Sequence, residues 1–199
     1  MRPMISRRAL LVAGSLSAAY ALSGCGKKQH WDLDNVGSVL PNLQFHLTSD
    51  TGQKVTAETY RGKVVILYFG YTHCPDVCPL TMSHLAQAVT ELGPQRKDVR
   101  ILFVSVDPAR DTLPILHAYT QAFSPQAVGL TGTMDQIQDV AKRYHVAFNY
   151  GKKDQYGNYV VDHSAAIYVF SKDGRGTLIG SDQSPVKSIV HDVRQLLAD

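Results

Sequence analysis

The sequence has few cysteines and almost no net charge beyond its first residues. Only 3 of its 199 residues are Cys, and the formal net charge is +3. Three of the 20 basic residues, Arg2, Arg7 and Arg8, lie in the first 24 positions, which contain no Asp or Glu. The rest of the chain therefore carries 17 basic and 17 acidic residues. This balance gives no electrostatic basis for binding nucleic acid. The composition is that of a globular protein of one domain.

The sequence also lacks an apolar run long enough to span a membrane comfortably. The run at 9–22 follows Arg7-Arg8 and ends in small residues, which is typical of an export signal; a retained transmembrane anchor is the weaker alternative. The segment Leu22-Ser23-Gly24-Cys25 resembles the lipobox of bacterial lipoproteins, whose cysteine is acylated and becomes the mature N-terminus. We predict a signal peptide at 1–24 and a polar tether at 25–41 with lipid on Cys25. The basic residues fit either general secretion or twin-arginine export.

With only three cysteines in the chain, few pairings between them are possible. If Cys25 carries lipid, Cys74 and Cys78 are the only pair left. An exported compartment favours disulfides, but a bridge that closes so small a loop stabilises a fold little. The residues therefore favour a chemical role for the pair over a structural one.

Hydrophobic patterns predict an α/β domain over residues 42–199. A continuous apolar run at 64–70 indicates a strand buried on both faces of a sheet, and an amphipathic run at 80–92 indicates a helix just after the cysteines. The other expected elements are a strand at 43–47, a strand at 100–106, a helix at 114–123, a short edge strand around 129–130, a helix capped by Thr133, a β-hairpin at 148–161, a strand at 165–170, a return strand at 177–179 and a helix that Ser184 caps. This order predicts a thioredoxin-like fold with an additional β-hairpin before the loop of His163. In that fold, reactive cysteines lie where the first central strand turns into its helix.

The pair Cys74 and Cys78 suits either thiol–disulfide exchange or metal binding. Pro79 indicates that Cys78 lies at the amino end of the helix, where free N–H groups and the helix dipole favour a thiolate; this serves both roles. Three residues separate the cysteines, whereas thioredoxin-type centres have two. The wider spacing suits two sulfurs on one ion, although it does not forbid a disulfide. Zinc and iron–sulfur sites usually need four ligands, so two thiolates completed by a histidine fit copper best.

The candidate third ligand is His163. It directly precedes the strand at 165–170, in a loop that is expected to face the cysteine loop. His73 adjoins Cys74, but neighbouring side chains at a strand end often point apart. Asp162 is a candidate acceptor that orients the His163 ring. The other histidines are predicted to lie on the surface: His30, His46, His84, His117, His145 and His191.

Three segments together carry a family resemblance. They are Cys74-Pro75-Asp76-Val77-Cys78-Pro79, Val106-Asp107-Pro108-Ala109-Arg110-Asp111-Thr112 and Val161-Asp162-His163-Ser164. From about residue 40 to the end, the chain resembles the Sco/SenC family. The resemblance implies a membrane-tethered copper protein that assists assembly of the binuclear copper site of cytochrome c oxidase. Its copper would be held by Cys74, Cys78 and His163, in either oxidation state.

The resemblance also implies partners and a location. The expected partners are the copper-site subunit of the oxidase and a protein that donates copper. Many family members keep an N-terminal transmembrane helix, whereas Cys25 indicates a lipid anchor here. We expect an exported lipoprotein that faces the periplasm or another extracytoplasmic space, on the cytoplasmic membrane where an oxidase would be.

The residues leave a second function open, that of a membrane-tethered thiol-disulfide oxidoreductase. In it Cys74 would attack and Cys78 would resolve, keeping the cysteines of the oxidase copper site reduced. A copper or redox sensor is a third, less favoured reading. His163 discriminates, because copper retention needs it and disulfide exchange does not. We expect Asp107-Pro108 and Arg110-Asp111-Thr112 to shape their loop and cap the next helix. Contact of Asp107 or Asp111 with copper or a partner is the less favoured alternative.

Overall fold

The computed structural model describes residues 29–199. The predicted signal peptide and Cys25 lie outside the described residues, as does the first part of the predicted tether. Residues 31–199 form one compact unit. Within the described part of the chain, no helix has the length and apolar character needed to cross a membrane.

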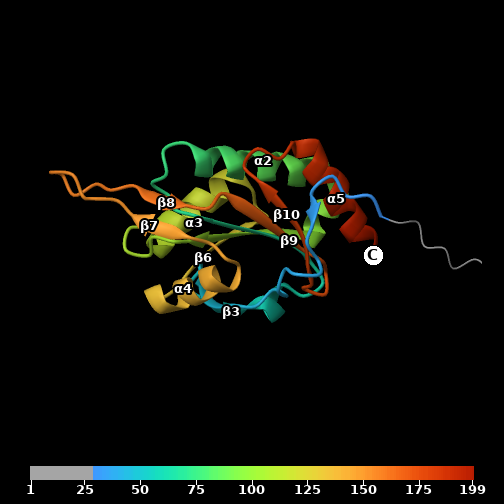
Figure 1. Cartoon of the computed structure of the whole chain (residues 1–199), viewed down its shortest axis with the longest axis horizontal. Coiled ribbons are helices and arrows are strands. Elements are labelled where there is room, and N and C mark those ends of the chain that lie inside the picture. The colour runs from blue at the N-terminus through green and yellow to red at the C-terminus, as the bar shows by residue number, and fades with distance from the viewer. Residues whose placement is uncertain (1–28) are drawn as a thin grey trace, which may run out of the picture. The chain divides into compact units, whose positions relative to one another are not determined.

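An eight-stranded mixed sheet forms the centre of the unit (Figure 1). Its three middle strands, β4, β5 and β6, are parallel, and every other pair is antiparallel. The strand order is β1 (Asp34–Asn35), β10 (Gly176–Ser181), β9 (Ala166–Phe170), β4 (Val64–Gly70), β5 (Val99–Ser105), β6 (Ala127–Thr131), β2 (His46–Ser49) and β3 (Lys54–Thr56). With helices on both faces this is a thioredoxin-like arrangement, as predicted.

Two strand predictions were wrong in detail. The strand expected at 129–130 is not an edge strand, because β2 pairs with β6 on the side away from β5. The strand expected at 43–47 begins only at His46. Before it, the Gln44 N–H donates to the Tyr144 hydroxyl at 2.9 Å rather than to a neighbouring strand.

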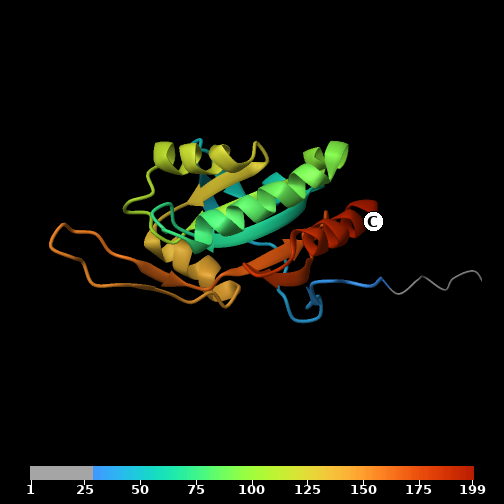
Figure 2. The same cartoon turned by 90° about the horizontal axis from the view of Figure 1, so that it is seen from above.

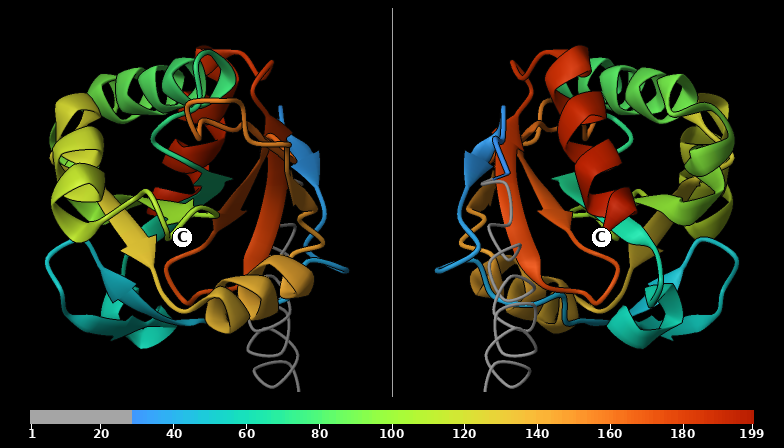
Figure 3. Two further views of the ribbon diagram at one scale, coloured as in Figure 1. Left: turned by 90° about the vertical axis from the view of Figure 1, so that its left-hand side faces the viewer. Right: turned by 90° about the vertical axis from the view of Figure 1, so that its right-hand side faces the viewer.

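Among residues 29–199, four α-helices cover the sheet: α2 (Val77–Glu91), α3 (Leu113–Phe123), α4 (Met134–Arg143) and α5 (Val186–Ala198). Short 3-10 helices occupy Ala57–Tyr60 and Gly93–Asp98. Figure 3 shows α2, α3 and α5 on one face and α4 on the other. The predicted cap of α4 is confirmed, since the Thr133 hydroxyl accepts from the Gln136 N–H. The N-cap of α5 is Pro185, whereas the Ser184 hydroxyl accepts from the Ser181 N–H.

The strand that leads to the cysteines is buried along its whole length. All seven residues of β4 are buried, which explains its unbroken apolar sequence. Successive side chains alternate between the faces. Tyr68 lies beside Phe103, which contacts Tyr119 of α3, whereas Phe69 lies beside Tyr144, which follows α4.

A separate two-stranded hairpin stands out from this body. Its strands, β7 (Phe148–Tyr150) and β8 (Val161–His163), pair only with each other. Figures 1 and 2 both show its loop, residues 151–160, reaching away from the sheet and helices. The predicted hairpin is confirmed, but His163 is the last residue of β8, paired with Phe148, rather than part of the following loop.

The segment from Trp31 to Asn35 lies against the body. β1 pairs with β10, and Leu33 is buried. The carboxylate of Asp192 on α5, which has no exposed surface, accepts from the backbone N–H groups of Asp32 and Leu33. Part of the polar stretch predicted as a tether is therefore fixed to the domain.

Candidate metal centre

The topology brings Cys74, Cys78 and His163 to one end of the sheet. The cysteine loop follows the carboxyl end of β4. Because β9 runs antiparallel to β4, with Tyr68 opposite Ile167, the start of β9 lies at that same end. His163 precedes β9 by three positions, so it faces the cysteine loop as predicted.

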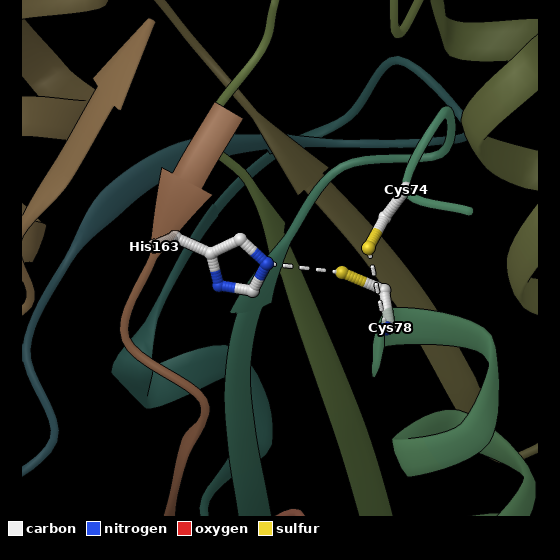
Figure 4. A group of neighbouring side chains, drawn as sticks. All are labelled: Cys74, Cys78 and His163. Atoms are coloured by element: carbon white, nitrogen blue, oxygen red, sulfur yellow. Dashed lines mark hydrogen bonds between the residues drawn. The ribbon is translucent and has the colours of Figure 1, made fainter. Parts of the chain in front are cut away.

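The three side chains converge on one point (Figure 4). Cys78 Sγ lies 3.1 Å from His163 Nε2, and the Cys78 N–H donates to Cys74 Sγ at 3.4 Å. One ligand atom from each residue lies within 4.8 Å of the other two. Both cysteines are free thiols in this structure.

Burial of the three residues is unequal. Cys78 has no exposed surface, whereas Cys74 and His163 are half-buried. Cys78 belongs to the first turn of α2, which packs its sulfur against β4 at Gly70. A Cβ at Gly70 would lie only 2.9 Å from Cys78 Sγ, so the glycine leaves the space that the sulfur fills. Solvent therefore reaches the group from the side of Cys74 and His163.

The protonation of Cys78 differs from the prediction. Burial, the largest cause, raises the pKa of the Cys78 thiol to about 12. Here desolvation outweighs the helix end, which was expected to favour the thiolate. The metal-free protein therefore keeps Cys78 neutral at pH 7, and a bound cation would have to replace its proton.

His163 is oriented for its Nε2 to act as acceptor or ligand. Its Nδ1 lies 3.0 Å from the backbone carbonyl of Ser164, which assigns the ring proton to Nδ1 and leaves the Nε2 lone pair facing the sulfurs. The orienting acceptor is therefore Ser164, not Asp162, which is exposed. Burial lowers the pKa of His163, so the ring is neutral at pH 7.

None of the other histidines within residues 29–199 joins the group. His73 Nδ1 lies 3.0 Å from the Thr72 hydroxyl. The His73 ring therefore points away from Cys74, as predicted. His84 was expected on the surface, yet its Nδ1 is buried with no hydrogen-bond partner. His191 lies near Asp32 and Asp192 in a second group of possible ligands. The Asp192 carboxylate of this second group accepts hydrogen bonds from the backbone N–H groups of Asp32 and Leu33. This structural role accounts for the group without a metal ion.

Sequence reasoning did not identify the residues that support the site. The N-cap of α3 is Thr112, within the segment that was expected to cap this helix. The buried Asp111 carboxylate instead accepts from the N–H and hydroxyl of Thr72 and from the Ser105 hydroxyl. It thus ties the cysteine loop to the end of β5. Asp107 and Arg110 contact the hairpin instead of the next helix. The segment Val106–Thr112 was the available signal, because the resemblance included it.

Comparison with known proteins identifies the family. A model of the SCO1/SenC family matches residues 39–198. The chain belongs to this family. The predicted family and thioredoxin-like fold are both confirmed.

Relatives in this family span several kingdoms. The human protein named Protein SCO1 homolog, mitochondrial, is 40% identical over 142 residues, which cover 70% of this chain and 47% of that one. The chain spans about half the length of the curated relatives it matches. A structure of Arabidopsis thaliana ScoI with copper bound has a TM-score of 0.73 and 35% identity, covering 79% of this chain and 98% of that one. A SCO1/SenC family lipoprotein from Bacillus anthracis has a TM-score of 0.66 and 25% identity, with coverages of 85% and 96%.

Proposed function

We propose that this chain is a copper-binding assembly factor for cytochrome c oxidase. In this proposal Cys74 Sγ, Cys78 Sγ and His163 Nε2 hold one copper ion, which passes to the copper-site subunit of the oxidase. The observation that carries the proposal is the convergence of these three atoms to within 4.8 Å at the carboxyl end of β4. The family, and relatives solved with copper bound, support it.

The donor atoms fit copper. Two thiolates suit the soft cuprous ion, and the neutral imidazole suits both copper oxidation states. Zinc would normally take a fourth protein ligand, and among the described residues no other Cys, His, Asp or Glu joins the group. The site therefore matches copper better than zinc.

The unequal burial suggests how copper would leave. Cys74 and His163 are partly exposed, whereas Cys78 is enclosed by α2 and β4. An incoming thiol or imidazole from a partner would therefore replace Cys74 or His163 first. Cys78 would release the ion last, and its high pKa favours taking up a proton as it does so.

We place this activity at a membrane surface. The lipobox-like segment that ends at Cys25 supports a lipid anchor on an exported chain, and so does the lipoprotein relative from Bacillus anthracis. Acyl chains bind membranes because each buried methylene contributes about 0.8 kcal/mol. Labelling cells with an alkynyl fatty acid would test the anchor: Cys25→Ser should abolish labelling, and labelling that persists would contradict it.

A thiol-disulfide oxidoreductase is the second candidate. Cys74 is the more exposed thiol, and its sulfur accepts a hydrogen bond from the Cys78 N–H. Cys74 would attack a target disulfide and Cys78 would resolve the mixed disulfide. The target would gain two electrons and two protons, and the pair would become a disulfide. This reaction does not need His163.

Anaerobic copper titration of the full chain in detergent tests the first proposal. Cys74→Ser and Cys78→Ser should each weaken Cu(I) binding strongly. His163→Ala should abolish the sulfur-to-copper charge-transfer band of the Cu(II) form while both thiols stay titratable. His73→Ala is the matched control, because His73 adjoins Cys74 but turns toward Thr72. Unchanged Cu(II) binding in His163→Ala would refute the ligand assignment.

A further inference from the structure

The loop between β5 and α3 contacts three different groups of Tyr159 in the hairpin: its hydroxyl, its backbone carbonyl and its ring. The Tyr159 hydroxyl donates to Asp107 Oδ1 at 2.8 Å. Arg110 Nη1 donates to the Tyr159 carbonyl at 2.9 Å, and the guanidinium carbon lies 3.6 Å from the centre of the Tyr159 ring. Arg110 Nε also donates to Asp107 Oδ2, which closes the cycle. One Asp–Arg pair therefore contacts the ring, the hydroxyl and the backbone of a single hairpin residue.

The interior position of this pair makes its contacts costly to break. The Asp107 side chain has no exposed surface, and the Arg110 side chain is 19% exposed. Hydrogen bonds between ionised groups are the stronger ones, and a buried carboxylate that loses a donor keeps its desolvation penalty. A cation over an aromatic face adds further attraction once water is excluded. The contacts thus hold Tyr159 firmly.

Apolar packing also holds the hairpin to the body, because Val161 of β8 is buried in the hydrophobic core and Phe148 of β7 packs against it. β7 and β8 pair only with each other, and an isolated two-stranded hairpin is at best marginally stable in water. Further polar contacts join the Tyr150 hydroxyl to the Val106 carbonyl, the Tyr71 hydroxyl to the Val161 backbone, and His163 Nε2 to Cys78 Sγ. Ala147 and Ser164 are hydrogen-bonded to each other at the base of the hairpin. The loop after β5 supplies the charged contacts to the outer part of the hairpin, so the position of β8, and of His163 at its end, depends in part on this loop.

The same loop also contacts the other half of the site. Asp111 binds Thr72 of the cysteine loop. The Arg110 guanidinium carbon lies 5.5 Å from the centre of the Tyr71 ring, and that ring meets the His163 ring edge-on at 5.9 Å. The loop thus touches the supports of both the thiols and the imidazole, although it supplies no ligand atom.

We propose that Asp107, Arg110 and Tyr159 form a clamp that holds His163 opposite the two thiols, which makes Arg110 a positioning residue of the copper site. The identity of the metal in this proposal rests on the proposed function. The clamp itself acts in the metal-free protein. Without it, the hairpin would move away from the body and carry the imidazole away from Cys78.

Copper oxidation state gives the clamp a specific signature. Cu(I) is held well by two thiolates, whereas Cu(II) prefers the added imidazole. Loss of a group that orients a ligand typically weakens metal affinity by about 10- to 100-fold. Releasing the clamp should therefore weaken Cu(II) binding by that factor and weaken Cu(I) binding much less. A general loss of fold stability would instead weaken Cu(II) binding and Cu(I) binding to the same extent.

The test compares Tyr159→Ala with Tyr156→Ala in the full chain in detergent. Tyr156 lies three positions away on the same hairpin loop and is 80% exposed, so it is a matched control. In the metal-free protein, Tyr159→Ala should speed hydrogen exchange in β7 and β8 at least about tenfold while β4 and β5 keep their protection. Tyr156→Ala should change neither. Two milder variants should give smaller effects in the same direction. Tyr159→Phe keeps the ring and loses the hydroxyl, and Arg110→Lys keeps the positive charge and loses the planar guanidinium with its several N–H donors.

Two results would overturn the clamp. One is unchanged hairpin exchange together with an unchanged ratio of Cu(II) to Cu(I) affinity in Tyr159→Ala. The other is an equal response in Tyr156→Ala. If the wild-type chain binds no copper, the proposed function is overturned, and hydrogen exchange in the metal-free variants still decides whether the clamp exists.

Discussion

Gly70→Ala should damage both the fold and the thiol pair. A Cβ at this position would lie 2.7 Å from Phe103 Cε2 and 2.9 Å from Cys78 Sγ. Neither neighbour has room to move, because both are fully buried, Phe103 on central strand β5 and Cys78 in the first turn of α2. Overpacking of this kind costs about 1–3 kcal/mol. Replacing glycine by alanine recovers about 0.4–1 kcal/mol through the unfolded chain. We expect the free energy of unfolding to fall by about 1–2 kcal/mol.

Urea denaturation of the metal-free chain measures that loss. Gly37→Ala is the matched control, because a Cβ there meets its nearest atoms at 3.5 Å, an ordinary contact. It should leave stability unchanged or slightly raised. Gly70→Ala should also weaken Cu(I) binding, since the Cys78 sulfur must shift away from β4. If Gly70→Ala is as stable as Gly37→Ala and binds Cu(I) like the wild type, the Cys78 sulfur does not pack against Gly70, and the account of its burial is wrong.

Three further predictions follow from the contacts of buried groups. Iodoacetamide at pH 7 should modify Cys74 well before Cys78, because a pKa of about 12 leaves the Cys78 thiol almost wholly protonated. The rate of Cys78 modification should rise about tenfold per pH unit up to that pKa. Equal modification rates of the two cysteines at pH 7, followed by mass spectrometry, would contradict this prediction. Asp111→Asn should lower the free energy of unfolding by about 1–3 kcal/mol, because a single amide oxygen cannot satisfy three donors; an unchanged urea midpoint would contradict it. Asp192→Ala should speed hydrogen exchange at Leu33 while the β4 amides stay protected, and protection that persists at Leu33 would show that β1 pairing alone holds the segment.

The Cys78 thiol connects the two candidate functions. Ionising it in the metal-free fold costs about 4 kcal/mol more than ionising a free thiol, since each pKa unit corresponds to about 1.4 kcal/mol. A cuprous ion with its positive charge would offset that cost, whereas a disulfide exchange that begins at Cys74 avoids it until the resolving step. The two activities therefore place different demands on Cys78, and Gly70→Ala should affect copper binding more than the initial attack by Cys74.

The sequence alone determined the fold class and the order of most elements. The seven apolar residues of β4 predicted a buried strand, and the amphipathic run after Cys78 predicted a helix that covers it; both are present. These patterns are local, so they can be read from neighbouring residues. Once the order matched a thioredoxin-like fold, the ends of β4 and β9 had to meet. His163 was therefore predictable as a neighbour of the thiols although it lies 85 positions from Cys78.

Tertiary structure alone decided how the site is protonated and supported. The Cys78 thiol stays neutral because the packing of α2 against β4 at Gly70 buries it, and no pattern around Cys78 reports that packing. The Arg110 contact with Tyr159 spans 49 positions and depends on where the hairpin folds back. Desolvation and long-range hydrogen bonds depend on distances in space, and those distances exist only once the chain has folded. Sequence thus indicated which atoms meet at this site, and the fold decided their charge and what holds them there.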